Sequence, residues 1–538
     1  MAETRSLSRR IWDSLQKERP DSKDAFLPLG SQNDILNHDL IRSDLMKVQG
    51  HLHGGTGRIF EYVDSSGRQL YAILAMIEKQ GTITDLMNQG IKDEHLPFQR
   101  PDKHAASFEL VPKDHKGSFS YFQNWTTSDI DKFGTYQWYM ISPKFKKGAL
   151  NMPMYHDLQD GIILPWLSRE LVERYPGGNS DVWKIEIHKS HHDFHQEKSN
   201  YFAIKALHSK DKGDFEVEFE NMKKLKSHNN LVNLLSAFSH KGTFNFLFPW
   251  ANGGNLKAFW EEHPDPEFEV WVLWVAKQCA GLADGLAEIH VVRPLLSEKS
   301  GIRNPTWEVN DINDDDKNFG RHGDIKPENV LLFHNDRNNE GNQDKGTLKL
   351  CDFGLTVFHS LKSKSLDRAS GIALPLTYNA PEADSDRTIS RRYDTWCLGC
   401  LYLELITWLL LGVRGLNEFK DKRRGERGAR HNFLSDQFFK LRDSKKGRYG
   451  IRKNAVVNWI KELQNLESCS DFIYDFLQFV KDHMLQSNES KRVEGYEVRD
   501  HFRALQDKCS NENYLLRKSP TGSGHEGSST GQQLGFLG

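Results

Sequence analysis

Cysteine is scarce in this chain of 538 residues, and neither sign of charge is in large excess. Six cysteines are too few for a disulfide framework in a chain of this length, which fits a reducing compartment. The 72 Lys and Arg nearly balance the 74 Asp and Glu, so we expect no nucleic-acid partner. Residues 1–24 hold no apolar stretch typical of a secretory signal. We therefore expect an intracellular protein, in the cytoplasm or the nucleus.

Long apolar runs are also rare, and one of them resembles a membrane span. Residues 396–413 are almost entirely apolar, but Glu404 lies near their centre and Asp394 just before them. A carboxylate is costly at that depth in lipid, so we predict a buried core helix and no contact with a membrane. Cys397 and Cys400 in this run are interpreted as small packing residues and not as metal ligands or a redox pair.

The length of 538 residues predicts two to four domains, since a domain has about 150 residues. Three- and four-residue apolar spacing in residues 26–110 indicates a small helical domain, whose expected use is binding a protein partner. Alternation of side-chain type at 182–187, 201–207 and 244–248 predicts three strands. The helical spacing of apolar residues at 270–290 predicts a long helix. The predicted division is a flexible N-terminus (1–25), the helical domain (26–110), a linker or extension (111–166), a two-lobed region (167–510) and a disordered Gly/Ser-rich tail (511–538).

Three short motifs in the two-lobed region combine polar residues with short apolar runs. They are FAIK at 202–205, HGDIKPENVLLF at 322–333 and LKLCDFG at 348–354. A proton acceptor and a metal ligand on one short loop can face the same phosphate. A carboxylate at a strand end, together with an amide oxygen, suits Mg²⁺, which prefers few protein ligands plus phosphate oxygens.

With these motifs the region resembles the eukaryotic protein kinase superfamily, of the Ser/Thr type with HGD in the catalytic loop. More loosely, the chain resembles kinase-domain proteins of filamentous fungi. The resemblance implies an α+β fold of two lobes, a small β-rich N-lobe and a larger helical C-lobe, preceded by the helical domain. It also implies ATP and Mg²⁺ as cofactors and a protein substrate that the sequence does not identify.

The resemblance assigns a role to each polar residue. Asp324 would orient the attacking hydroxyl, Lys326 would steady the transferred phosphoryl group, and Lys205 would contact the α- and β-phosphates. Asn329 and Asp352 would hold Mg²⁺. Glu218 is the expected helix partner of Lys205, with Glu220 as the alternative. The predicted nucleotide-binding residues are Gly177, Gly178, Val182, Ala203, Lys205, Phe248, Trp250, Ala251 and Leu332.

YNAPE at 378–382 resembles the end of an activation segment, and Arg492 is the expected ion partner of Glu382. These features favour a protein kinase over a small-molecule kinase. Two residues depart from the family pattern. Ser180 replaces the last glycine of the glycine-rich loop, and Gly323 replaces the usual Arg of the catalytic loop.

Without that Arg, activation by phosphate on Ser363, Ser365 or Ser370 is in doubt. The side chain of Arg321 is expected to point elsewhere and not to receive that phosphate, so the helical domain becomes the candidate regulator.

Two polar segments are interpreted as solvated loops and not as metal sites: residues 295–321, with the acidic run 314–316, and the histidines His188, His191, His192 and His195.

The sequence thus predicts a protein kinase that transfers the γ-phosphate of ATP to Ser/Thr hydroxyls. The alternative is a pseudokinase that acts as a signalling scaffold or an ATP-binding module. The intact polar set favours the enzyme, whereas Ser180 and Gly323 favour the pseudokinase.

Overall fold

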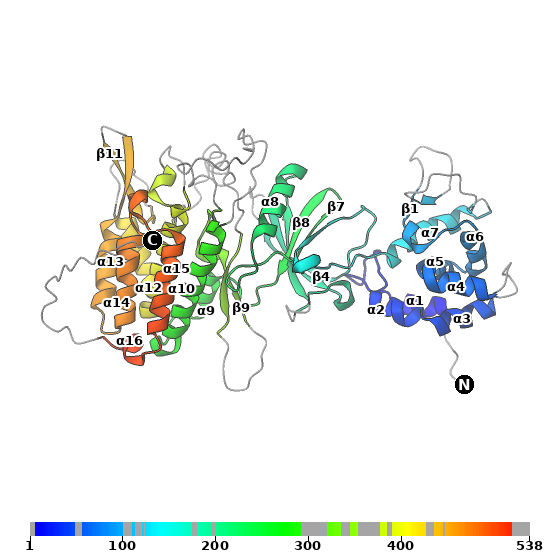
Figure 1. The fold of residues 1–538 in the computed structure, drawn as a ribbon, viewed down its shortest axis with the longest axis horizontal. Helices are drawn as coiled ribbons and strands as arrows, with labels where there is room; N and C mark the ends of the chain where they lie inside the picture. Colours follow the sequence, from blue (N-terminus) through cyan, green and yellow to red (C-terminus); the bar gives the residue numbers. More distant parts are fainter. Residues whose placement is uncertain are drawn as a thin grey trace, which may run out of the picture. The chain divides into compact units, whose positions relative to one another are not determined.

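The computed structural model divides the chain into two compact units (Figure 1). Unit 1 contains Met1–Phe215 and Asn233–Trp250, and unit 2 contains Glu216–Val232 and Ala251–Gly538. The structure describes residues 6–48, 56–99, 110–112, 121–122, 124–174, 180–194, 199–291, 320–334, 345–352, 377–384, 390–426, 435–444 and 447–518.

Unit 1 begins with a helical region built around α5 (Arg68–Met76). Every residue from Leu70 to Met76 is buried, so α5 is the centre of the bundle. The surrounding elements are α1 (Leu7–Ser14), α2 (Leu29–Ile35), α3 (His38–Lys47), α4 (Thr56–Ser66), η2 (Gln80–Thr82), α6 (Ile83–Asn88), η3 (Asp93–His95), β1 (Phe98–Gln99), β2 (Val111–Pro112) and α7 (Thr127–Met140). The core includes Ile11 of α1 and Met140 of α7. The helical region therefore starts earlier and ends later than the predicted 26–110.

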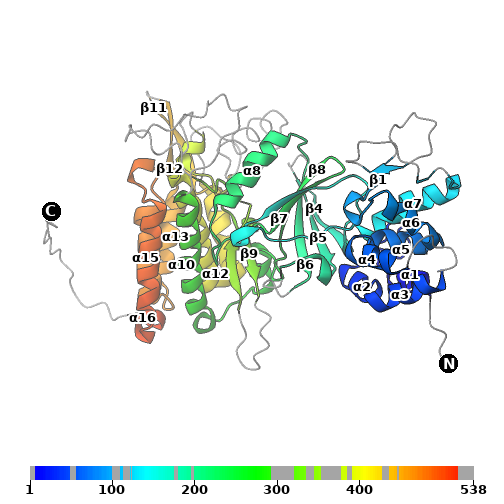
Figure 2. The ribbon, with the colours of Figure 1, turned by 45° about the vertical axis from the view of Figure 1, so that its right-hand side comes forward.

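The second part of unit 1 is a six-stranded sheet in the order β3-β7-β8-β6-β5-β4 (Figure 2). Its strands are β3 (Met154–Asp157), β4 (Trp166–Arg174), β5 (Ser180–Ile187), β6 (Tyr201–Leu207), β7 (Ser236–His240) and β8 (Thr243–Pro249), with the short helices η4 (Ala149–Asn151) and η5 (Lys189–His191) between them. The pairs are antiparallel except β3 with β7, which is parallel. The three predicted strands are confirmed as β5, β6 and β8.

The sheet has one apolar face because side chains alternate along each strand. Phe202 and Ile204 of β6 are buried in a core with Ile185, Ile187 and Leu247. Ala203 and Lys205 lie on the opposite face. The helix α8 (Lys212–Lys224) follows β6, and its Phe215 stacks on Phe246 of that opposite face, with ring centroids 5.1 Å apart.

The helical region joins the sheet through a buried histidine. Leu29 N–H donates to His191 Nε2 at 3.1 Å, and the Nδ1 of His191 lies 2.9 Å from the carbonyl oxygen of Pro143. His191 is fully buried, and burial lowers its pKa to about 4. The prediction of a surface loop is therefore wrong for His191, which α2 contacts through Leu29. It is also wrong for His192, which is buried because its ring packs against Phe202 of β6. His195 lies outside the described residues.

Unit 2 is mainly helical, and one large apolar core runs through it. Its elements are α9 (Leu256–Glu262), α10 (Phe268–Val291), η9 (Pro327–Asn329), β9 (Val330–Phe333), β10 (Thr347–Leu350), η10 (Pro381–Asp384), α12 (Arg392–Gly425), β11 (Phe439–Ser444), β12 (Gly447–Arg452), α13 (Asn454–Asn465), α14 (Asp471–Phe479), η11 (Val480–Met484), η12 (Glu489–Lys491), α15 (Gly495–Lys508) and α16 (Glu512–Leu516). Side chains of Asn255 and Ser470 cap α9 and α14.

The long apolar run forms α12, which is interrupted at Gly412. This helix is long and apolar enough to cross a membrane, yet 83% of its most apolar window is buried inside the protein. The prediction of a core helix is confirmed. Cys397 and Cys400 are buried free thiols in that core, as expected for packing residues.

Candidate active site

The catalytic loop is held by one buried carboxylate at the start of α12. Asp394 is fully buried and accepts hydrogen bonds from the backbone N–H groups of His322 and Gly323, both at 2.8 Å. The Nε2 of His290 on α10 lies 3.0 Å from the same carboxylate. Burial opposes the charge of Asp394, but the hydrogen bond with His290 and nearby cations outweigh it, so its pKa is lowered. The charged carboxylate therefore fixes the loop backbone.

Gly323 has a φ of +83°, a left-handed conformation that glycine adopts without strain. A Cβ atom built on Gly323 would lie 3.9 Å from Nε of Arg321. Arg321 is buried, and its charge helps to lower the pKa of Asp394. Arg321 therefore lies close to Gly323, but the serines of the activation segment lie outside the described residues, so the expectation that Arg321 does not receive their phosphate stays a prediction.

Three predicted catalytic residues meet on this loop. Lys326 Nζ lies 2.6 Å from Asp324 Oδ2, and Asn329 Nδ2 donates to the backbone oxygen and Oδ2 of Asp324 at 2.8 and 2.9 Å. Burial disfavours the charged ammonium of Lys326, but the Asp324 carboxylate outweighs this effect and the pKa of Lys326 is raised. The side chain of Asp324 is 54% exposed, so a hydroxyl from outside can reach it.

The antiparallel pairing of β9 with β10 places the backbone of Asp352 near Asn329. Val330 pairs with Leu350, and Cys351 N–H donates to the Asn329 carbonyl oxygen at 3.0 Å. Asp352 follows at once, exposed and with a φ of +55°. Because the Asn329 amide nitrogen bonds Asp324, its amide oxygen is turned away from that carboxylate. One carboxylate and one neutral amide oxygen suit Mg²⁺ that also binds phosphates.

No group of three or more His, Cys, Asp or Glu that would suit a metal ion occurs among the described residues. The acidic run 314–316 lies outside the described residues.

In unit 1 the predicted nucleotide residues share one face of the sheet. Val182 pairs with Lys205, and Ala203 pairs with Phe248. Paired residues project to the same side, and so do residues two apart on one strand, so these four side chains project from the face opposite the apolar core. Trp250 follows β8, and Lys184 Nζ, from the same face, lies 5.1 Å from its ring centroid. This face combines apolar side chains with Lys205.

The glycine-rich loop lies mostly outside the described residues, including Gly177 and Gly178. Ser180 is the first residue of β5 and is buried. It therefore belongs to the strand as much as to the loop.

The remaining predicted nucleotide residues lie in unit 2. Leu332 of β9 is buried and exchanges backbone hydrogen bonds with the segment that follows Ala251, since Leu332 N–H donates to Gly254 O and Gly253 N–H donates to Leu332 O.

On α8, Glu218 is 9% exposed, whereas Glu220 forms an ion pair with Lys223 at 2.8 Å. This difference favours Glu218 over Glu220 as the functional glutamate.

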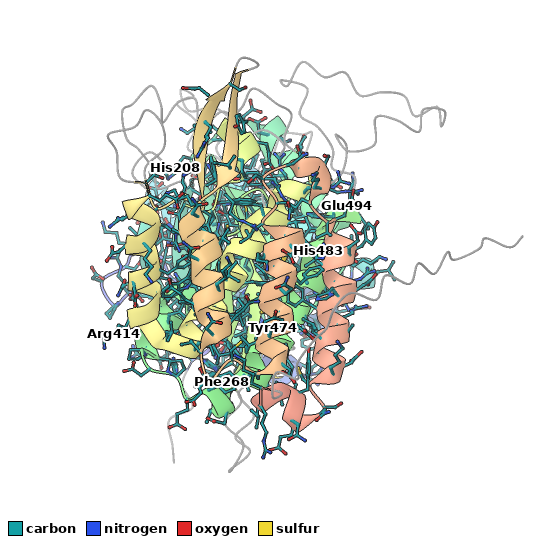
Figure 3. All side chains as sticks on the ribbon, turned by 90° about the vertical axis from the view of Figure 1, so that its left-hand side faces the viewer. His208, Phe268, Arg414, Tyr474, His483 and Glu494 are labelled. Carbon is teal, nitrogen blue, oxygen red and sulfur yellow. The ribbon has the colours of Figure 1, made fainter. Side chains whose placement is uncertain are left out.

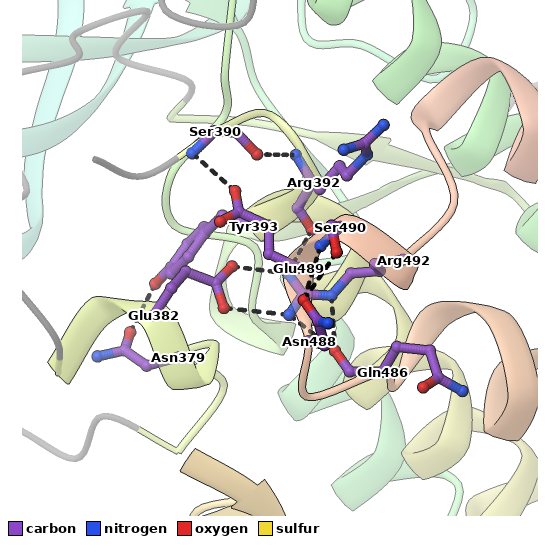
Figure 4. Close-up of polar contacts among 10 residues, drawn as sticks. All are labelled: Asn379, Glu382, Ser390, Arg392, Tyr393, Gln486, Asn488, Glu489, Ser490 and Arg492. Carbon is purple, nitrogen blue, oxygen red and sulfur yellow. Dashed lines mark hydrogen bonds and ion pairs between the residues drawn. The ribbon is translucent and has the colours of Figure 1, made fainter. Parts of the chain in front are cut away.

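The end of the activation segment is fixed by the predicted ion pair (Figure 4). Arg492 Nη1 and Nη2 lie 2.6 and 3.0 Å from the carboxylate oxygens of Glu382, and both side chains are buried. Tyr393 Oη donates to Asn379 at 2.7 Å, which connects this segment to the residue beside Asp394. The predicted pair is confirmed. Ser363, Ser365 and Ser370 lie outside the described residues.

Two family models match the chain. The protein kinase domain model matches residues 317–502, and the model for protein tyrosine and serine/threonine kinases matches residues 175–295. This part of the chain is a protein kinase domain. Its sheet of six strands and its helical unit agree with the predicted two-lobed α+β fold.

Curated relatives resemble parts of the kinase domain. Fibroblast growth factor receptor 1 of Pleurodeles waltl is 27% identical over 211 residues, which cover 38% of this chain and 22% of the receptor. A probable cyclin-dependent kinase 8 of Dictyostelium discoideum is 33% identical over 125 residues, or 23% of this chain and 31% of the relative. The chain thus spans less than a third of the length of these relatives.

The sequence analysis missed a second buried polar group in the kinase domain. Glu404 of α12 accepts a hydrogen bond from Tyr378 Oη at 2.5 Å and forms an ion pair with Arg423 at 2.8 Å. Arg423 Nε also donates to the Asp436 carbonyl oxygen at 2.9 Å, and the Asp436 carboxylate accepts from Thr377 at 2.8 Å. The signal was Glu404 itself, since a carboxylate in an apolar helix needs a partner.

Proposed function

We propose that the chain is an active protein kinase that uses ATP and Mg²⁺ to phosphorylate Ser and Thr residues of protein substrates inside the cell. The observation that carries this proposal is the arrangement of Asp324, Lys326 and Asn329 on one loop fixed by Asp394. A folded binding module has no need for an exposed carboxylate that touches both an ammonium and an amide.

The chemistry follows from these contacts. Asp324 accepts a hydrogen bond from the substrate hydroxyl and orients its oxygen for attack. Lys326 keeps its positive charge beside Asp324 and can neutralise the phosphoryl group as it moves. Asn329 and Asp352 would hold Mg²⁺, which when bound offsets negative charge on the phosphates. Lys205, which projects from the face of the sheet opposite the apolar core, would supply a further cation for the phosphates.

The preference for Ser and Thr is supported by Lys326, because the resemblance assigns a different residue at this place to tyrosine-specific kinases. The relatives include a receptor named for a growth factor and a cyclin-dependent kinase, so they leave the acceptor open. The similarity to kinase-domain proteins of filamentous fungi stays a prediction, as does a protein partner for the helical region.

The pseudokinase is the second candidate, because Ser180 replaces a glycine beside the phosphates. One experiment separates the two. Purified full-length protein is incubated with radiolabelled ATP, Mg²⁺ and a mixed protein substrate, and phosphoamino acids are then identified. We expect phosphoserine and phosphothreonine, and a loss of about a thousandfold in Asp324→Asn.

The matched control is Asp39→Asn, since the side chain of Asp39 is 97% exposed in the helical region. It should retain full activity. Nucleotide binding without transfer in the unmodified protein would establish the pseudokinase, and phosphotyrosine alone would reverse the acceptor assignment.

A further inference from the structure

Lys184 of β5 is a second lysine on the sheet face that carries Lys205. Lys184 pairs with Ala203, and Val182, two residues earlier on β5, pairs with Lys205. Paired residues share a face, and so do residues two apart on one strand. The two lysines therefore project from the same face, and the row of Lys184 lies about 7 Å along the strands from the row of Lys205.

The ammonium of Lys184 lies over two aromatic rings. Its Nζ is 4.9 Å from the ring centroid of Tyr201 and 5.1 Å from that of Trp250. Both distances fall within the range, up to about 6 Å, in which a cation is attracted to the negative face of an aromatic ring. Tyr201 is the first residue of β6, and Trp250 directly follows β8. One side chain of β5 thus connects the ends of two other strands.

The order of the strands explains what this contact adds. β6 lies between β5 and β8, so the backbone hydrogen bonds of β5 do not extend to β8. The pairing of β8 with β6 ends at Pro249, opposite Phe202, and proline has no N–H to donate. Trp250 comes after this last pair and is half-buried. The contact with Lys184 therefore restrains a ring that lies beyond the end of the strand pairing.

We propose that Lys184 is a positioning residue for nucleotide binding, which acts by holding the ring of Trp250 on this face of the sheet. This inference rests on the proposed function, in which Ala203, Phe248 and Trp250 belong to the nucleotide site. Ala203 is directly opposite Lys184, and Phe248 is paired with Ala203. A restrained Trp250 keeps this end of the face in one conformation, so less conformational freedom is lost when the nucleotide binds.

The first test observes Trp250 directly and needs no nucleotide. Full-length protein is labelled with fluorotryptophan, and the fluorine NMR resonance of Trp250 is assigned by its loss in Trp250→Phe. Lys184→Met keeps an unbranched side chain but removes the charge, so it should shift that resonance. Lys184→Arg should leave the resonance near its original position, because a guanidinium also binds aromatic faces. An unchanged Trp250 resonance in Lys184→Met would overturn the inference.

The matched control is Lys79→Met. Lys79 Nζ lies 5.2 Å from the ring centroid of Trp125 in the helical region, which is the same kind of contact at another place in the chain. This variant should shift the resonance of Trp125 and leave that of Trp250 in place. A second control, Arg414→Met, removes an exposed positive charge from α12 in unit 2 (Figure 3). It should shift neither resonance.

The second test measures nucleotide affinity by calorimetry with ATP and Mg²⁺. Kd should be about threefold higher in Lys184→Met than in the unmodified protein, and Lys184→Arg and Lys79→Met should leave it unchanged. In the Trp250→Leu background, Lys184→Met should change Kd much less, because the ring through which Lys184 acts is gone. An equal change in both backgrounds would show that Lys184 acts on the nucleotide without Trp250, and the inference would be wrong.

The two tests separate this inference from the proposed function. Absence of ATP binding in the unmodified protein would overturn the proposed function together with the nucleotide role of Lys184. Binding of ATP with a Kd or a Trp250 resonance that does not respond to Lys184→Met would overturn the inference alone. A shifted resonance together with a weaker, Trp250-dependent affinity supports it.

Discussion

Helix α12 carries two buried carboxylates, Asp394 and Glu404, whose negative charges are stabilised by different kinds of partner. Asp394 receives backbone N–H groups and a histidine, whereas Glu404 receives a tyrosine hydroxyl and the guanidinium of Arg423. The first holds the backbone of the catalytic loop, and the second holds the side chains of Tyr378 and Arg423. The partners of Asp394 lie 71 to 104 positions away along the chain, whereas Arg423 lies on the same helix as Glu404, 19 positions further on.

The largest effect is expected at Asp394. Asp394→Asn would place amide hydrogens against two backbone N–H donors, so the loop should shift and activity should fall by at least about a hundredfold. The free energy of unfolding should drop by about 3 kcal/mol, because buried donors lose their acceptor. Kinetics and urea unfolding of the full chain measure both. Asp39→Asn should change neither, and near-normal kcat in Asp394→Asn would show that the carboxylate does not position the loop.

The next effect concerns Arg423. Arg423→Met leaves Glu404 buried without its cation, which should cost about 3 kcal/mol of unfolding free energy. The double variant Arg423→Met with Glu404→Leu removes both charges and should regain most of that loss. Urea unfolding checks the cycle, with Arg414→Met as the exposed control. If the double variant is as unstable as the single one, the pair is not what stabilises this region.

Low pH should distinguish the contribution of Asp394 to folding stability from that of His191. The folded pKa of His191 is lowered to about 4, below its unfolded value, so its contribution is complete above pH 6.5 and is lost as the pH falls toward 4. Between pH 7 and 5 the protein should lose about 2 kcal/mol from this residue. The folded pKa of Asp394 is also lowered, so its contribution is lost only at pH values below the ordinary carboxyl range.

Unfolding of His191→Gln at several pH values tests this separation. The variant should be less sensitive to pH between 7 and 5, whereas His38→Gln, at an exposed position, should behave as the unmodified protein does. An unchanged pH profile in His191→Gln would contradict the assignment.

The smallest effect is expected at Tyr378. Tyr378→Phe removes one hydrogen bond to Glu404 but leaves the ion pair with Arg423, so the cost should be about 1 kcal/mol. KM for a protein substrate should rise more than kcat falls, because Asp324 is untouched. Tyr496→Phe, at an exposed tyrosine, is the control. A fall in kcat at constant KM would place Tyr378 with the catalytic loop instead.

The contacts of the kinase domain differ in how far they could be predicted from the sequence. Asp324, Lys326, Asn329 and Asp352 lie within short motifs, so their grouping on the β9–β10 side of unit 2 followed from local spacing. The pair of Glu382 with Arg492 spans 110 positions, and only the family resemblance indicated it. The spacing of Glu404 and Arg423 did not indicate their contact, because 19 residues of straight helix would hold them about 28 Å apart and the contact depends on the break of α12 at Gly412. The buried His191 was missed for the same reason, since its partners are Leu29 and Pro143.

The strand register of β6 has a consequence for insertions and deletions. Ala203 and Lys205 face one side of the sheet, and Phe202 and Ile204 face the other. Deleting one residue before Lys205 would move that lysine into the apolar core and bring a core residue out in its place. Deleting two residues would keep each side chain on its own face. A deletion scan through β6 should therefore show tolerance that alternates with a period of two, and single-residue deletions should be the more harmful.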